Sequence, residues 1–102
     1  MKNYKIAITD AAERDLLGAY YYLYFELRNP MAAEKFKTVL QEKINTLSEA
    51  PYMGETFELV PEYRIAHAYR HRIFYFVDEN DNTVVVSKVF YVGRDNPRVE
   101  DL

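Results

Sequence analysis

The side chains best suited to chemistry are concentrated in residues 63–77, whose sequence is YRIAHAYRHRIFYFV. This segment holds both histidines of the chain, His67 and His71, and three arginines, Arg64, Arg70 and Arg72. Arginine binds phosphate and carboxylate groups through paired N–H donors, and histidine is the side chain that most often transfers protons. The segment is therefore consistent with an RNA-cutting site, with a docking surface, or with an ordinary strand that has a polar edge.

The two histidines alone do not define a chemical site. A metal site needs further ligands at regular spacing, and the residues near His67 and His71 supply none. The chain has no cysteine, which excludes disulfides and thiolate metal sites. A proton-transfer role needs a partner group within hydrogen-bond reach. We therefore expect both histidines at a strand edge, with no bound metal and no cofactor.

The composition indicates one folded domain spanning residues 1–102, with 49% apolar and 16% aromatic residues. The net charge of −3 argues against a simple electrostatic nucleic-acid binder, which would usually be basic. The predicted strands after residue 62 nevertheless carry only positive charge, so a local basic groove is compatible with the acidic chain. No apolar run approaches the roughly 20 residues of a membrane span, and a cytoplasmic location is expected.

The residues before this segment predict a strand followed by a helix. Tyr4, Ile6 and Ile8 alternate with other residues, which predicts a strand within residues 3–8. Asp10 and Glu13 have the spacing of a capping box, which predicts the start of a helix. The apolar face of this helix would consist of Ala12, Leu16, Ala19, Tyr20, Leu23 and Leu27.

A second helix is predicted between Asn29 and Pro51. Asn29 is a favoured N-cap residue, Pro30 suits the first helical position, and Pro51 ends the helix. Because the connection between the two helices is short, they should form an antiparallel hairpin. The apolar face of the second helix would consist of Ala33, Phe36, Leu40, Ile44 and Leu47.

The rest of the chain predicts a loop followed by three strands. The loop spans residues 54–62, and the strands lie near residues 63–68, 71–78 and 83–92, with a tight turn at DENDN, residues 78–82. The resulting order is β-α-α-β-β-β. This order predicts an α+β domain in which a helical hairpin packs on one face of a small antiparallel sheet.

Both faces of the last two strands are apolar, although the helices can cover only one face. Strict alternation separates the strand residues into two sets. In residues 72–77, one face holds Ile73, Tyr75 and Val77, and the other holds Arg72, Phe74 and Phe76. In the last strand, one face holds Val84, Val86, Lys88, Phe90 and Val92, and the other holds Val85, Ser87, Val89 and Tyr91. The sequence does not determine which face of one strand lies beside which face of the other. A partner, a second copy, or residues 52–62 together with the C-terminal tail must cover the second face.

Five basic residues lie in or beside the predicted strands. They are Arg64, Arg72, Lys88, Arg94 and Arg98. Singly, each is well explained as a solvated charge that discourages edge-to-edge aggregation. Together they form a positive rim that suits an acidic, apolar peptide or a nucleic-acid backbone. Tyr21 and Tyr24 point away from the apolar helix face, so we expect them to pack against a loop or a partner.

The order and spacing of several segments resemble the RelE/ParE superfamily of toxins from type II toxin–antitoxin systems. The segments are YKIAITDAAERDL, NPMAAEKF, INTLSEAPYMG, YRI, RHRIFYFVD and VVVSKVFYVGRD. The resemblance covers about residues 4 to 95. It implies a bacterial cytoplasmic toxin that arrests growth until a co-expressed antitoxin neutralises it. RelE-like members cleave messenger RNA on the ribosome, whereas ParE-like members act on DNA gyrase.

The resemblance also implies candidate site residues. Arg72 matches the arginine that stabilises the scissile phosphate in the nucleases, and Arg94 matches the arginine after the last strand. Tyr91 occupies a position where many members carry histidine or tyrosine, so it is a candidate acid or base. Arg64 matches a basic position of the preceding strand. If the chain is an enzyme, which the sequence leaves open, these residues would serve a ribosome-dependent mRNA endoribonuclease.

Two positions depart from the nuclease pattern. Ala66 stands near the position of a second basic residue, and Glu100 near that of a catalytic tyrosine. Phosphate stabilisation without proton transfer makes a poor nuclease, and this favours the ParE-like interpretation with gyrase as target. An inactive relic that only binds antitoxin remains an alternative.

The partner prediction rests on the second apolar face. We expect an antitoxin to contact Phe74, Phe76 and Phe90 or their opposite-parity neighbours, with Arg64 and Lys88 at the binding surface. Without a partner, we expect a homodimer through the same surface. Growth arrest should depend on Arg72 projecting into the functional groove.

Overall fold

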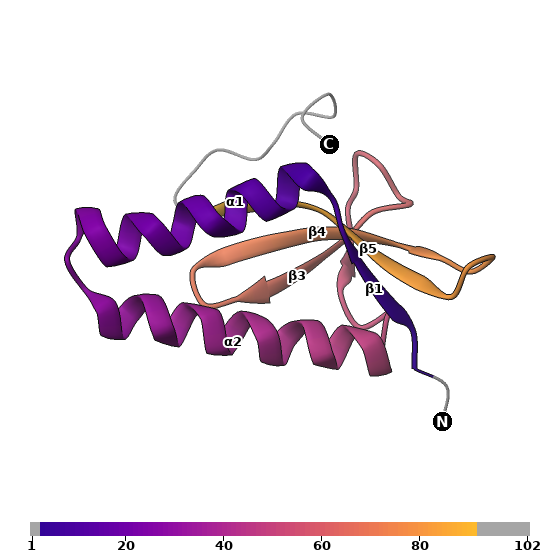
Figure 1. Ribbon diagram of the computed structural model, residues 1–102. Helices are drawn as coiled ribbons and strands as arrows, with labels where there is room; N and C mark the ends of the chain where they lie inside the picture. The colour runs from indigo at the N-terminus through magenta and orange to yellow at the C-terminus, as the bar shows by residue number, and fades with distance from the viewer. Residues whose placement is uncertain (1–2, 92–102) are drawn as a thin grey trace.

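Two helices pack against one face of a five-stranded sheet in the computed structural model, which describes residues 3–91 (Figure 1). The elements are β1 (Lys5–Ile8), α1 (Asp10–Tyr21), the π-helix η1 (Tyr22–Glu26), α2 (Pro30–Glu49), β2 (Glu55–Thr56), β3 (Arg64–Ala68), β4 (His71–Asp78) and β5 (Thr83–Tyr91). The predicted element order and fold class are confirmed. The helices form the expected hairpin, and no helix within residues 3–91 combines the length and apolar character needed to cross a membrane.

The sheet is mixed rather than wholly antiparallel. Its strand order is β1-β5-β4-β3-β2, and β1 pairs with β5 in parallel, with Lys5 opposite Thr83 and Ile8 opposite Val86. The other pairings are antiparallel. Parallel neighbours need a long connection, and here almost the whole chain lies between β1 and β5. Local patterns could not predict this pairing because each strand looks the same in either direction.

The first helix begins with a different cap from the one predicted. The N-cap is Thr9, whose Oγ1 accepts a hydrogen bond from the Ala12 N–H at 3.1 Å and donates one to the Ser87 carbonyl at 2.7 Å. Asp10 and Glu13 instead lie in the first turn, where acidic side chains favour the helix dipole. The predicted N-cap at Asp10 is therefore wrong by one residue. Thr9 is the N-cap, and its hydroxyl also bonds the helix start to β5.

The first helix ends earlier than predicted, since it was expected to continue to Asn29-Pro30. Regular α-helix stops at Tyr21, and residues 22–26 form η1, in which the Leu27 N–H donates to the Tyr22 carbonyl at 3.0 Å. Such π-helical turns are rare and occur often at functional sites. The second helix matches the prediction, since the Asn29 side chain accepts from the Ala32 N–H at 3.1 Å and Pro30 is the first helical residue.

The helix-covered face of the sheet forms the main core. Its fully buried residues include Phe36 and Leu47 from α2, with Ile73, Tyr75 and Val84 from the sheet. The buried positions of α2 are the five predicted ones, Ala33, Phe36, Leu40, Ile44 and Leu47.

A β-bulge overturns the predicted alternation along β5. Phe74 pairs with Lys88, but the next residue of β4, Tyr75, pairs with Val86, which leaves Ser87 as an extra residue. Val89 consequently joins the helix-covered face beside Val84 and Val86. By the same shift, Lys88 and Phe90 fall on the outer face, by which we mean the sheet face turned away from the helices.

Part of the outer face is covered by the chain itself. Phe74 is 0% exposed and Phe90 9% exposed, and they form one cluster with Phe57. The Phe74 ring centroid lies 5.2 Å from that of Phe57 and 5.4 Å from that of Phe90. Val60, Tyr63 and Ile65 complete this cluster. Of the covers considered from the sequence, the loop within residues 52–62 is confirmed. The C-terminal tail lies outside the described residues.

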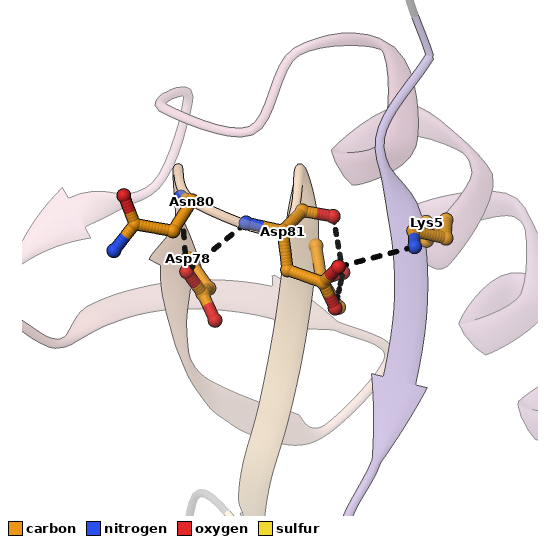
Figure 2. Close-up of polar contacts among 5 residues, drawn as sticks. Lys5, Asp78, Asn80 and Asp81 are labelled. Carbon is orange, nitrogen blue, oxygen red and sulfur yellow. Dashed lines mark hydrogen bonds and ion pairs between the residues drawn. The ribbon is translucent and has the colours of Figure 1, made fainter.

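The turn between β4 and β5 confirms the turn predicted at DENDN, residues 78–82. The Asp78 Oδ1 accepts hydrogen bonds from the backbone N–H groups of Asn80 at 3.0 Å and Asp81 at 3.3 Å (Figure 2). Figure 2 also shows Lys5 reaching across from β1, with its Nζ 3.3 Å from the Asp81 Oδ1. The turn thereby links the parallel edge strand to the antiparallel part of the sheet.

Candidate functional site

A cavity of about 760 Å³ lies at one end of the sheet, where the β3–β4 turn and the last residue of β5 meet the helical hairpin. We call this the open end. Residue pairing places His71 opposite Tyr91 there. The cavity is lined by Arg14, Asp15, Gly18, Ala19, Tyr22, Leu23, Leu27, Asn29, Ala32, Tyr69, Arg70, His71, Val89 and Tyr91. The size suits a small ligand or the side chains of a partner.

His71 is the most constrained polar side chain of the open end. It is 8% exposed, and its ring packs 4.7 Å from the Phe36 ring and 5.6 Å from the Tyr91 ring, between centroids. Its buried Nδ1 has no hydrogen-bond partner within residues 3–91. Burial lowers the pKa of His71 below its ordinary value of 6.5, so the ring is neutral at physiological pH. The predicted strand-edge position is wrong for His71, because β4 is an interior strand, His71 pairs with both Ala68 and Tyr91, and its ring is buried.

The charge of the open end is positive. Asp15 is engaged by β5, since its carboxylate accepts from the Val89 N–H at 3.0 Å and lies 3.2 Å from the Lys88 Nζ. Arg14 and Arg70 also line the cavity, and no acid within residues 3–91 forms an ion pair with either. Among the described residues, nothing therefore neutralises these two guanidinium groups.

Arg64 has a structural environment. Its Nη1 donates to the Gly54 carbonyl at 2.8 Å and to the Tyr52 carbonyl at 3.2 Å, and its guanidinium carbon lies 5.0 Å from the Tyr52 ring centroid. It pairs with Tyr75, which places it on the helix-covered side, away from Phe74 and Lys88. These contacts fasten the loop after α2 to the sheet, so Arg64 does not share a surface with the other predicted binding residues.

Of the three predicted catalytic residues, Arg72 and Tyr91 lie on opposite faces of the sheet. Arg72 is half-buried on the outer face, opposite Phe90, whereas Tyr91 is 47% exposed on the helix-covered side, opposite His71. Tyr91 lies opposite His71, which is the neighbour of Arg72 in β4. Because consecutive residues of a strand point to opposite faces, the sheet separates the side chains of Arg72 and Tyr91. Arg94 lies outside the described residues.

The predicted binding residues of the outer face have mixed exposure. Phe74 and Phe90 are buried beneath the loop, and Phe76 is half-buried with its ring centroid 5.5 Å from that of Tyr63. The Lys88 Nζ lies 5.4 Å from the Phe90 ring centroid and also pairs with Asp15. In this conformation the two buried rings stabilise the fold and present no surface to a partner.

The remaining histidine belongs to the sheet edge, as predicted. The His67 Nε2 lies 3.4 Å from the Glu55 Oε1, and both side chains are largely exposed. Within the described part of the chain, no group of three His, Cys, Asp or Glu side chains is placed to hold a metal ion.

Single sequence positions could not reveal the cavity of the open end, because its walls come from both helices and two strand ends.

Solved structures with the same architecture come from toxin–antitoxin systems. A chain of the ParDE system of P. aeruginosa superposes with a TM-score of 0.71 at 20% identity, covering 90% of this chain and 99% of that one. The RelBE2 toxin–antitoxin complex of Mycobacterium tuberculosis gives 0.64 at 24% identity, covering 87% and 98%. The isolated RelE toxin of E. coli gives 0.61 at 18% identity, covering 91% and 88%. These likenesses define the RelE/ParE fold.

The sequence itself then identifies the family. Residues 6–96 match the family described as the ParE toxin of type II toxin-antitoxin system, parDE. No curated protein matches the chain. Because the match spans most of the 102 residues, the chain belongs to the ParE toxin family.

Proposed function

We propose that this chain arrests growth by inhibiting DNA gyrase and that a cognate antitoxin neutralises it. The observation that carries the choice of target is the separation of Arg72 from Tyr91 by the sheet. RNA cleavage through the 2′-hydroxyl needs a proton acceptor and a cation at one phosphate. Arg64 does not complete such a site because it binds two backbone carbonyls.

Membership of the ParE family supports the same choice, since the resemblance associates ParE-like members with gyrase. The net charge of −3 also suits a protein target better than ribosomal RNA. The antitoxin follows from the relatives, among them the RelBE2 toxin–antitoxin complex and the ParDE system. Inhibition by binding to a protein requires no catalytic group. It is therefore compatible with the positions of Arg72 and Tyr91 on opposite faces of the sheet.

The alternative is a ribosome-dependent mRNA endonuclease. One observation favours it: Arg72 and Lys88 share the outer face, where Arg72 lies opposite Phe90 and Lys88 opposite Phe74. Two cations on one face could stabilise a phosphate. This site would still need a proton acceptor from elsewhere, and Tyr91 cannot supply it from the other face.

A short pulse of expression in cells without the antitoxin tests the proposal. DNA synthesis and protein synthesis should be followed separately, together with the ends of transcripts. We expect DNA synthesis to stop and DNA-damage signalling to rise while translation continues. An immediate stop in translation, with new transcript ends inside codons, would establish the endonuclease instead. Co-expression with the neighbouring antitoxin should restore growth in either case.

A further inference from the structure

We propose that the cavity of the open end binds a small anion with a flat ring, of the nucleoside phosphate class. This inference goes beyond gyrase inhibition and does not depend on it. It rests on the size of the cavity and on the cations and aromatic rings that line it.

The cavity lies between the helical hairpin and the β3–β4 turn, and its volume of about 760 Å³ is in the range of small-ligand sites. Figure 1 shows the connection between α1 and α2 extending beyond the β3–β4 turn. Leu27 and Asn29 of the connection, Ala32 of α2, and Tyr69 and Arg70 of the turn all line the cavity.

The anionic part of the ligand would meet two cations. Arg14 and Arg70 line the cavity without an acidic partner within residues 3–91. Guanidinium groups bind phosphate through paired N–H donors. The nearby N-terminus of α2 adds no free donor, because the Ala32 N–H is bonded to the Asn29 Oδ1 and Pro30 has no N–H. The acid at the cavity, Asp15, is already bonded to the Val89 N–H and paired with Lys88.

The flat part of the ligand would meet aromatic side chains. Tyr22, Tyr69 and Tyr91 line the cavity and are 55%, 37% and 47% exposed, so their rings can stack on a base. His71 lies among them, 92% buried by its 8% exposure, with a buried Nδ1 that lacks a partner within the described residues. Buried polar atoms without partners are uncommon in folded proteins and are frequent at functional sites.

The tight β3–β4 turn places Tyr69 at the cavity, because Tyr69 and Arg70 form a two-residue hairpin loop whose first residue takes a positive φ. Tyr69 has a φ of 57°, a left-handed conformation that favours glycine over a bulky residue. The π-helix η1 places Tyr22 and Leu23 on the opposite wall. Both features cost stability, and both position side chains that line the cavity. The turn and η1 thus hold Tyr69 and Tyr22 at the walls of one cavity.

Calorimetric titration of the purified chain with AMP and GMP tests the proposal, with adenosine and inorganic phosphate as half-ligands. We expect saturable nucleotide binding with a dissociation constant below roughly 1 mM, and about tenfold weaker binding of either half-ligand. Arg70→Gln and Tyr69→Gly should each weaken nucleotide binding about tenfold. Lys35→Gln, which removes an exposed cation of α2 that does not line the cavity, should leave binding unchanged.

Three results would overturn the proposal: no saturable binding of either nucleotide, equal binding by wild type and both cavity variants, or binding of a poly-glutamate peptide with no binding of nucleotides. Tyr69→Gly relieves the positive φ and should fold, which circular dichroism would verify. If it does not fold, Arg14→Gln takes its place, because Arg14 is exposed. Toxicity in cells plays no part in this test, so its failure is distinct from failure of the gyrase proposal.

Discussion

The two ends of the sheet differ in how completely their polar groups are paired. At the end formed by the β4–β5 turn and the residues after α2, which we call the closed end, Tyr75 Oη donates to the Pro51 carbonyl at 2.7 Å and accepts from the Gly54 N–H at 3.0 Å. Arg64 holds two further carbonyls in the same place. The open end instead leaves His71 Nδ1 and two arginines without partners within residues 3–91.

The closed end therefore stabilises the fold, whereas the open end is suited to binding a ligand or a partner. Paired buried groups make an end rigid and intolerant of change, whereas unpaired groups beside a cavity retain capacity for binding. Changes at the closed end should therefore unfold the protein. Changes at the open end should affect binding while the free energy of unfolding changes little.

Gly54→Ala should cause the largest loss of stability. A Cβ there would lie 2.6 Å from the Tyr75 Oη and 2.8 Å from the Ile65 carbonyl oxygen, and the backbone atom cannot move aside cheaply. We expect a loss of about 3 kcal/mol in the free energy of unfolding, measured by urea denaturation. Gly18→Ala is the matched control, because a Cβ at Gly18 has no neighbour within 4 Å. Equal stability of the two variants would remove the basis for calling this end closed.

Tyr75→Phe should have the next largest effect. The ring stays, but the Pro51 carbonyl and the Gly54 N–H both lose their buried partner. Leaving such groups unsatisfied should cost about 2 kcal/mol of unfolding free energy. Tyr91→Phe at the open end, compared in the same urea titration, should change stability by less than about 0.5 kcal/mol. A larger loss in the Tyr91 variant would reverse the comparison.

High pH should loosen the closed end. Tyr4 and Tyr52 both donate to the Glu79 Oε1, at 2.8 and 2.7 Å. The hydrogen bond to Glu79 raises the pKa of Tyr52 to about 12 and also raises the pKa of Tyr4 above 10.0. Because the folded pKa values exceed the unfolded ones, this stability is complete below pH 10 and is lost as pH rises toward about 12.

Urea denaturation at about pH 8 and about pH 11 would measure this loss. Tyr52→Phe should lose less stability between the two pH values than wild type does, since it has one fewer phenol to ionise. An identical loss in both proteins would show that the phenol pair does not determine alkaline stability.

A smaller effect than at the closed end is expected from His71→Leu at the open end. Burial lowers the pKa of His71, so its contribution to stability is present above 6.5 and is lost as pH falls through the lower folded value. Leucine removes this dependence and the unpaired Nδ1, and stability at neutral pH should change by less than about 1 kcal/mol. Stability curves that stay parallel from about pH 7 to 5 would contradict the assignment of a neutral, buried ring.

Local signals predicted the elements of this fold because each depends on near neighbours. Asn29 and Pro30 gave the start of α2, and the apolar spacing gave its five buried residues. The parallel pairing of β1 with β5 was not predictable from local patterns, because Lys5 and Thr83 are paired in space but lie far apart in the sequence. The bulge at Ser87 was missed for a related reason: alternation along β5 looks regular until the register with β4 is known.

The candidate site was less predictable than the fold. The sequence drew attention to His71 and Arg70, which do line the cavity, but it grouped Arg72 and Tyr91 although the sheet separates them. Arg14 was overlooked, because an exposed basic residue of a helix has no local mark of function. Its role depends on the β3–β4 turn, some 55 residues later by count, coming close in space.

The gyrase proposal is tested most directly with purified components. Gyrase should be incubated with relaxed plasmid and ATP in the presence of the purified chain, and both supercoiling and cleaved DNA should be measured. The proposal predicts dose-dependent loss of supercoiling that is reversed by the cognate antitoxin and retained by the Tyr91→Phe variant, since no catalytic tyrosine is required. Full supercoiling at a large excess of the chain, together with ribosome-dependent mRNA cleavage that Tyr91→Phe abolishes, would contradict it.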